Sequence, residues 1–360
     1  MQSILAHAPG RVELLGNHTD YNEGLVLSAA IDRGVTVHGT ERTDGQVVLK
    51  SLALEKSVTV PGNAIVKQEE ESWANYALGV VEVFGQRGFK IGGFSMEIVS
   101  DLPIGAGLSS SAALEVATAT FLKKLFEWEI TPLELAKLCR QVENQFVGVN
   151  CGLLDQVSSV FGRKNSAIFL DCRAESVENV AFPDNVALLI THSGVKHALV
   201  GGEYNERREQ CFGAAKKMGV PFLRDITSTE LEEAREKLTT LEYRRAAHVV
   251  GETERVSQGI EFLRTGNARG FGELMFASHE SSRTNFENST PELDALVHIA
   301  REDDGVYGSR LTGGGFGGAT VSLIHAEQAQ RIAASIEQKY REQTGIECRT
   351  YLCEIDDGAR

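Results

Sequence analysis

The chain has 360 residues, of which 42% are hydrophobic and 24% charged, enough for a large buried core and more than one typical domain needs. Its formal net charge is −14, and so acidic a surface repels nucleic-acid phosphates and anionic lipid. No stretch is long and apolar enough to span a membrane. We therefore expect two lobes and a protein that binds neither nucleic acid nor membrane.

The number and spacing of the cysteines bear on the cellular compartment in which the protein is expected. Six cysteines occur, at positions 139, 151, 172, 211, 348 and 353. They form no CxxC pair and no spacing typical of a zinc site, so reduced thiols are expected. The N-terminus, MQSILAHAPG, lacks the basic and apolar regions of a targeting segment. We expect a cytoplasmic protein.

In chain order, the first glycine-rich segment is residues 8–34, APGRVELLGNHTDYNEGLVLSAAIDRG. Apolar and β-branched runs predict short strands in and after it. These strands cover residues 12–15, 25–31, 35–40 and 47–52. The loop between the first two is strongly polar. Arginine, aspartate, histidine and asparagine together suit a polyhydroxylated ligand, although a charged surface loop is the alternative.

The second glycine-rich segment lies between a predicted strand at 94–99 and a predicted helix at 112–126. Its sequence, DLPIGAGLSSSAALEVA, offers glycine backbone N–H groups, serine hydroxyls and a helix N-terminus to an anion. It lacks the GxxxxGK[ST] pattern of a Walker loop. A phosphate-binding loop is one reading, and a serine-capped helix after a turn is the other.

Helical patterns dominate residues 132–146, 203–218 and 229–263. The third glycine-rich segment, SRLTGGGFGGATVSLI at 309–324, ends in a predicted strand at 319–324. Such a loop can close on a ligand or serve as a flexible connection. The mixture of strands and helices predicts an α/β or α+β fold.

Two carboxylates stand out in VENQFVGVNCGLLDQ at 142–156. Glu143 and Asp155 are separated by a glycine-containing stretch. Near a phosphate loop, one carboxylate could bind magnesium and the other could lie near an attacking hydroxyl. Two ordinary exposed acids are the alternative.

Taken together, these segments resemble one family. APGRVELLGNHTDYN resembles the galactokinase signature, and PIGAGLSSSAALEVA resembles the ATP-binding motif of the galactokinase, homoserine kinase, mevalonate kinase and phosphomevalonate kinase (GHMP) superfamily. SRLTGGGFGGATV looks like the third motif of that superfamily. ENQFVGVNCGLLDQ and EYNERREQC, at 203–211, are similar to galactokinases in particular. The motifs occur in the family's order over residues 8–324.

The resemblance implies an α+β, bilobal GHMP-kinase fold with the active site in the cleft between the lobes. We expect an N-terminal lobe over 1–185 and a C-terminal lobe over 186–360, with a return of the last strand to the first lobe as an alternative. The signature begins at residue 8, whereas many family members carry a longer N-terminal extension. The implied reaction is ATP- and Mg²⁺-dependent phosphorylation of the anomeric hydroxyl of galactose by a monomer.

The resemblance also implies roles for matching residues. The catalytic pair is Asp155 and Arg11. The sugar-contacting positions are Asn17, His18, Asp20, Gly152 and Tyr204. The magnesium ligands are Ser111 and Glu143. The ATP-contacting positions are Trp73, Tyr76, Gly105, Gly107, Ser109, Ser110, Ser111, Gly314 and Gly315.

Asn17 departs from the family pattern. Galactokinases usually carry glutamate at this position, which accepts a hydrogen bond from the sugar 6-hydroxyl. Asn17 has lost that charge, so we expect better tolerance of 6-modified sugars and tighter galactose binding in an Asn17→Glu variant. A 1-kinase for galacturonate, N-acetylgalactosamine or arabinose is the first alternative. A non-catalytic galactose sensor is the second, although the run SSSAA and Asp155 are both intact.

Overall fold

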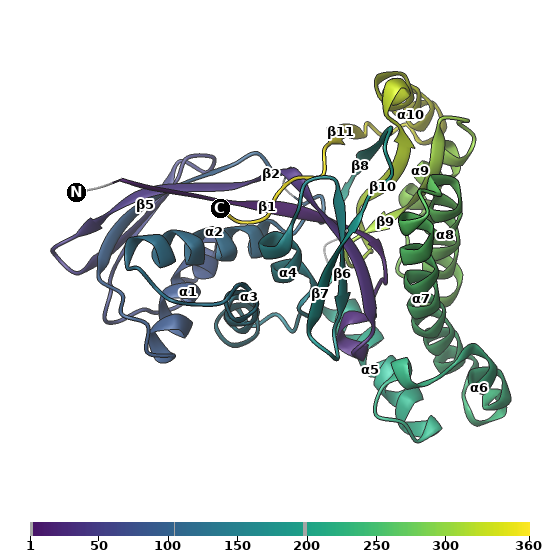
Figure 1. Ribbon diagram of the computed structural model, residues 1–360, viewed down its shortest axis with the longest axis horizontal. Coiled ribbons are helices and arrows are strands. Elements are labelled where there is room, and N and C mark those ends of the chain that lie inside the picture. The colour runs from purple at the N-terminus through teal and green to yellow at the C-terminus, as the bar shows by residue number, and fades with distance from the viewer. Residues whose placement is uncertain (1–2, 104, 197–199) are drawn as a thin grey trace.

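The structure is a computed structural model that describes residues 3–103, 105–196 and 200–360. Two sheets, each covered by helices, form two lobes (Figure 1). The mixed helices and strands confirm the predicted α+β class. Ile104 of the second glycine-rich motif lies outside the described residues.

The first sheet contains the strands of the first half of the chain. Across the sheet the order is β4-β3-β5-β2-β6-β7, and β1 pairs with β2. The bounds are β1 Ile4–Leu15, β2 Leu25–Arg42, β3 Gln46–Ser51, β4 Lys56–Pro61, β5 Gly93–Ser100, β6 Ser166–Asp171 and β7 Ser176–Ala181.

The strands predicted at 25–31 and 35–40 are parts of one long strand, β2. Gly34, at the predicted break, lies so close to β1 that a Cβ there would collide with the carbonyl oxygen of Ala8. The glycine therefore allows β1 and β2 to approach each other closely, and it does not end β2.

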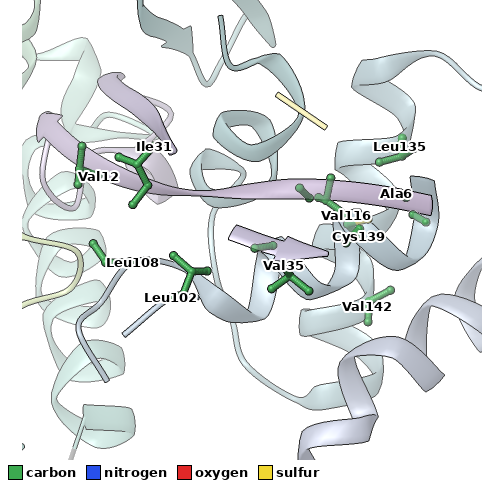
Figure 2. Close-up of a cluster of buried hydrophobic side chains, with 14 of the residues drawn as sticks. Ala6, Val12, Ile31, Val35, Leu102, Leu108, Val116, Leu135, Cys139 and Val142 are labelled. Carbon is green, nitrogen blue, oxygen red and sulfur yellow. The ribbon is translucent and has the colours of Figure 1, made fainter. Parts of the chain in front are cut away.

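Helices cover one face of the first sheet (Figure 1). They are α1 Asn75–Gln86, α2 Ser110–Leu125, α3 Pro132–Gln141 and α4 Leu154–Phe161. The main apolar core fills the space between β1 and these helices, and Figure 2 shows Val12, Val35 and Val116 among its members. A π-helical turn, Val142–Val147, extends α3.

The second sheet has the order β11-β8-β10-β9. Its strands are β8 Val186–Lys196, β9 Val306–Thr312, β10 Gly317–His325 and β11 Arg349–Cys353. Its helices are α5 Val200–Met218, α6 Ser228–Glu233, α7 Thr240–Arg264, α8 Ala268–Ser281, α9 Pro291–Arg301 and α10 Ala329–Thr344. Figure 1 shows α7 and α8 standing side by side along this lobe.

The helix predicted at 229–263 is interrupted, which corrects that part of the prediction. The chain leaves α6, makes a single 3₁₀ turn at Arg235–Lys237 and begins α7 afresh. Thr239 caps α7 through a capping box with Glu242, and this arrangement satisfies N–H groups that a continuous helix would have bonded internally.

The chain end returns to the first lobe. β11 itself pairs with β8 in the second sheet, and the residues that follow it run back to β1 and β2. Ile355 forms a bridge with Ile31, and the backbone N–H of Arg360 donates to the carbonyl of His7 at 2.9 Å. Within the described residues, no helix is long and apolar enough to cross a bilayer.

Candidate active site

A cavity of about 490 Å³ lies where the two lobes meet. The first lobe lines it with β1 and with residues 148–155, and the second lobe with Tyr204, Asn205 and the Gly313–Gly314 loop. The volume falls within the usual range of small-molecule sites. Segments distant in sequence therefore meet at one ligand-sized space.

Asp155, in the first turn of α4, is held by two donors. The Arg11 guanidinium lies 2.6 Å from Asp155 Oδ1 through Nη2, and Ser109 Oγ donates to Oδ2 at 2.6 Å. Arg11 is nearly buried, whereas a quarter of the Asp155 side chain is exposed. Charge-assisted hydrogen bonds of this kind fix a carboxylate in position, and here Asp155 lines the cavity.

Ser109 and Arg11 come from two segments that support each other. Ser109 precedes α2 with a φ of 56°, a left-handed conformation that is uncommon for serine. Arg11 Nη1 donates to the Gly107 carbonyl at 2.6 Å. We predicted an ATP contact for Ser109, and in the structure its hydroxyl is directed to Asp155.

The backbone of β1 explains why Arg11 and Glu13 both line the cavity. Alternate residues of a strand share a face, so Val12 and Leu14 enter the core while Arg11 and Glu13 lie opposite. The pairing of β1 with β2 is irregular on both sides of this stretch. Such irregularities re-aim side chains beside functional sites.

Asn17 sits in a buried polar network. Its Nδ2 donates to Glu13 Oε1 and to the Gly313 carbonyl, both at 2.9 Å. Its Oδ1 accepts from Asn288 Nδ2 at 2.9 Å. The side chain is almost fully buried and lines the cavity. The network joins β1, the third glycine-rich loop and the segment after α8.

His18 is a neutral part of the cavity wall. Its Nε2 lies 3.0 Å from the Gly314 carbonyl, which can only accept, so Nε2 carries the proton. Nδ1 then accepts from the Tyr21 hydroxyl at 2.9 Å. Burial lowers the pKa of His18 to about 4. Both ring nitrogens are therefore engaged within the protein.

Asp20, Gly152 and Tyr204 meet at another part of the cavity. A Cβ at position 152 would collide with Asp20 Oδ2, so glycine is required for the carboxylate to lie there. Burial, then the charge of Glu13, raises the pKa of Asp20 to about 7, and Asp155 adds to the rise. Burial, then Asp20, likewise raises the pKa of the Tyr204 hydroxyl.

Glu143, in the π-helical turn, faces Ser111 at the first turn of α2. Burial raises the pKa of Glu143, while hydrogen bonds from Cys151 and Ser111 oppose the rise. The Cys151 thiol donates to Glu143 Oε2 at 2.8 Å. Among the described residues no lysine or arginine pairs with Glu143, and no cluster of three or more His, Cys, Asp or Glu could hold a metal by itself.

The second and third glycine-rich loops lie against each other. Gly105 and Gly107 have left-handed φ values of 77° and 67°, and Gly313 has 78°. A Cβ on Gly313 would stand 3.1 Å from the Gly107 carbonyl oxygen, so a side chain would strain both loops. Ser110, the first residue of α2, is exposed beside them.

The aromatic pair in WANY lies outside the cavity lining. Trp73 packs against the main core and its Nε1 donates to Glu71 Oε2 at 2.7 Å. Tyr76 lies in the first turn of α1, and its pKa is raised by burial, then by the charge of Glu143. Tyr76 is therefore close to Glu143, the carboxylate that faces Ser111.

Sequence reasoning missed three residues of the network. Glu13 shares a strand face with Arg11, and that alternation was a usable signal. Asn288 and Glu252 carry no such signal, because each meets the 13–17 segment only through the fold. Glu252 Oε2 accepts the N–H groups of Gly16 and Asn17, both at 2.8 Å.

Three family models match the chain. They are the galactokinase galactose-binding signature over residues 1–40, the GHMP kinases N terminal domain over 75–163 and the GHMP kinases C terminal over 260–342. The chain is 42% identical to galactokinases of Bos taurus and Homo sapiens, covering 99% of this chain and 92% of each relative.

Solved structures agree with these matches. A Lactococcus lactis galactokinase complexed with galactose aligns with a TM-score of 0.95 and 32% identity over 100% of this chain and 95% of that one. A mevalonate kinase aligns with a TM-score of 0.72 and 21% identity over 98% of this chain and 99% of that one, and so shares the fold.

Proposed function

The chain belongs to the galactokinase family of the GHMP kinases, and we propose how its cleft carries out the reaction. The reaction is transfer of the γ-phosphoryl group of ATP to the anomeric hydroxyl of D-galactose, giving α-D-galactose 1-phosphate and ADP. The curated relatives favour galactose over the other sugars considered.

The central proposal is that Asp155 and Arg11 act on the anomeric hydroxyl. The contact between them at the cavity wall, with Ser109 on the second carboxylate oxygen, is the observation that carries it. Asp155 accepts or orients the hydroxyl proton, and Arg11 pairs with the carboxylate and steadies developing charge. In a loose phosphoryl-transfer transition state, such positioning and charge supply most of the catalysis.

We assign the ATP phosphates to the loop that contains Gly105, Gly107 and Ser110. The exposed backbone there and the N-terminus of α2 suit an anion. Gly314 and Gly315 close the site from the second lobe. Trp73 and Tyr76 contact the adenine, since each offers an aromatic face that is only partly buried.

Magnesium fits the Ser111–Glu143 pair. Glu143 is a nearly buried carboxylate whose pKa is raised, so a cation would supply charge that its neighbours do not. Mg²⁺ typically takes one or two protein oxygens together with substrate phosphates, which agrees with a two-residue site. When bound, the ion would neutralise charge on the phosphates.

His18, Asp20, Gly152 and Tyr204 form the sugar-facing wall in this proposal. Asp20 accepts from sugar hydroxyls, and Gly152 leaves room for its carboxylate. His18 orders the wall through its bonds to Tyr21 and Gly314 and offers the sugar an apolar ring face.

The Asp155→Asn variant tests the central proposal, because it keeps the shape of the side chain and removes its charge. We expect kcat to fall at least about 100-fold, the usual scale for a lost general base. ATP affinity should stay within about twofold. Ser109→Ala, which removes one orienting bond, should cost much less. Near-normal turnover by Asp155→Asn would remove Asp155 from the mechanism.

We further propose a cytoplasmic monomer. All six cysteines are free, which agrees with a reducing compartment. The net charge of −14 disfavours self-association. Light scattering at the concentrations used for assay would check the monomer, and a dimer mass would contradict it.

A further inference from the structure

A carboxylate lies beside Asn17 although position 17 itself carries none. Glu13, four residues earlier, lines the same cavity and accepts from Asn17 Nδ2 at 2.9 Å. Glu13 is 4% exposed and Asn17 is 1% exposed. The charge that the sequence appeared to lack is therefore present at the adjacent side chain.

Hydrogen bonds fix which way the Asn17 amide points. Both hydrogens of Nδ2 are used, by Glu13 and by the Gly313 carbonyl. A flipped amide would place its oxygen against those two acceptors, so the observed orientation is enforced. Oδ1 accepts from Asn288 and keeps one free acceptor position. Asn17 thus offers a ligand an acceptor and no donor.

Burial raises the pKa of Glu13, and the largest influence that opposes this rise is its buried partner, Arg310. Arg310 is fully buried, and its Nη1 lies 3.2 Å from Glu13 Oε1. Arginine stays protonated at neutral pH, so a neutral Glu13 would leave a buried charge unpaired. Oε1 takes the bonds from Asn17 and Arg310. Oε2 makes no hydrogen bond with the rest of the described chain and is the oxygen available to a sugar hydroxyl.

We propose that Glu13 determines sugar selectivity, acting with Asn17 as one unit in which Glu13 supplies the negative charge and Asn17 an oriented acceptor. This inference rests on the proposed sugar-kinase function. A neutral sugar can donate a hydroxyl to Glu13. A sugar with a carboxylate at the same place meets a like charge that is shielded little by solvent.

The same geometry limits one expectation drawn from the sequence, the tolerance of 6-modified sugars, and reverses another, the effect of Asn17→Glu. Anionic 6-modified sugars should be rejected, because the charge was moved to Glu13 and not lost. The Asn17→Glu variant should bind galactose more weakly, because it would set a second carboxylate against Glu13 and the Gly313 carbonyl.

The test is the Glu13→Gln variant, assayed with ATP and each of three sugars: galactose, galacturonate and L-arabinose. Galacturonate carries a carboxylate at C6, whereas L-arabinose is neutral and lacks C6. We expect kcat/KM for galacturonate relative to galactose to rise by about tenfold or more. The ratio for L-arabinose should change much less. Both ratios are taken on one enzyme sample, so they do not depend on the fraction folded.

Glu252→Gln is the matched control. Glu252 is a fully buried carboxylate that binds the backbone of the same loop, but it does not line the cavity. Its kcat/KM for galacturonate relative to galactose should stay within about twofold of the wild-type value. A rise equal to that of Glu13→Gln would assign the effect to loosening of the loop and overturn the proposal.

The double variant Glu13→Gln/Asn17→Asp provides a rescue. It keeps one charge in the pair and exchanges the residue that carries it, at the cost of the bond to Gly313. Discrimination against galacturonate should return toward wild type. If Glu13→Gln folds too poorly to assay, this double variant and Asn17→Asp still compare one charge with two.

The outcomes separate this inference from the proposed function. A wild-type enzyme that fails to phosphorylate galactose would contradict the function itself. Galactose turnover with a galacturonate ratio unchanged by Glu13→Gln would leave the function standing and overturn the role of Glu13. A parallel rise for galacturonate and L-arabinose would also overturn it, since charge would then not be the cause.

Discussion

At the scale of single residues, the cavity is dominated by carboxylates. Glu13, Asp20, Glu143 and Asp155 line it, and within the described residues Arg11 is the basic side chain among them. Each acid is stabilised differently: Asp155 by Arg11 and Ser109, Glu13 by Arg310. Glu13, Asp20 and Glu143 all have raised pKa values, because burial disfavours their charge more than their neighbours favour it.

Asp20 makes the folded protein sensitive to pH. Its pKa is raised to about 7, chiefly by burial, from an unfolded value near 4. The unfolded chain therefore loses this proton first, and the contribution of Asp20 to the unfolding free energy falls as pH rises from about 4 to 7. Above about pH 8 both states are ionised and the contribution stays constant.

The Asp20→Asn variant measures this contribution. The difference in unfolding free energy between wild type and variant should move in favour of the variant by about 1–4 kcal/mol between pH 5 and pH 8. Urea denaturation at several pH values would show it. A difference that is constant across this range would mean that Asp20 titrates near its ordinary pKa.

Asp20 should also make galactose binding pH-dependent. An ionised carboxylate accepts hydroxyl hydrogen bonds more strongly than a neutral one. Accordingly, galactose KM should fall as pH rises from about 6 to 8, severalfold in all. Asp20→Asn should weaken binding and flatten that profile, and an equally steep profile in the variant would assign the titration to another group.

The magnesium site can be tested at Ser111 and Glu143. Ser111→Ala and Glu143→Gln each remove a hard oxygen ligand, so the Mg²⁺ concentration for half-maximal rate should rise roughly tenfold. Ser257→Ala, at an exposed residue of α7 outside the cavity lining, should not shift that concentration. If all three variants titrate like wild type, the metal is held elsewhere.

At the scale of elements, the alternation of residues along a strand predicts more of the site than the residues of its loops do. The alternation in β1 predicts that Arg11 and Glu13 share a face, and the glycine-serine loop before α2 is evident from residue types alone. The hydrogen bonds that orient Asn17, in contrast, cannot be predicted from the local sequence. They come from Gly313 and Asn288, hundreds of positions away, and no local propensity predicts such a partner.

The local sequence was sufficient to predict where α7 begins, but this signal was overlooked in the prediction of one continuous helix. Thr239 and Glu242 have the spacing of a capping box. Thr239→Ala should lower the unfolding free energy by about 1 kcal/mol, the usual value of such a cap. Thr240→Ala, at the exposed residue one position later, should change it by less than half of that. Equal effects in a denaturation series would contradict the assignment of the cap.

At the scale of the whole molecule, the active site exists because two lobes are joined around β1. Glu13 meets Arg310, Gly16 meets Glu252, and Gly107 lies against Gly313. The order of motifs along the chain predicts the fold class and the position of the cleft. The network could not be predicted, because it depends on how the second lobe docks on the first.

The role of Asp155 and Arg11 at the anomeric hydroxyl is tested most directly by identifying the product formed from galactose and ATP. Purified protein should release ADP with galactose as acceptor, and ³¹P NMR should show one product phosphorylated at C1 in the α configuration. Asp155→Asn should produce almost none of it. If galactose binds without ADP release, or if the phosphate appears on another hydroxyl, the account of Asp155 and Arg11 at the anomeric position is wrong.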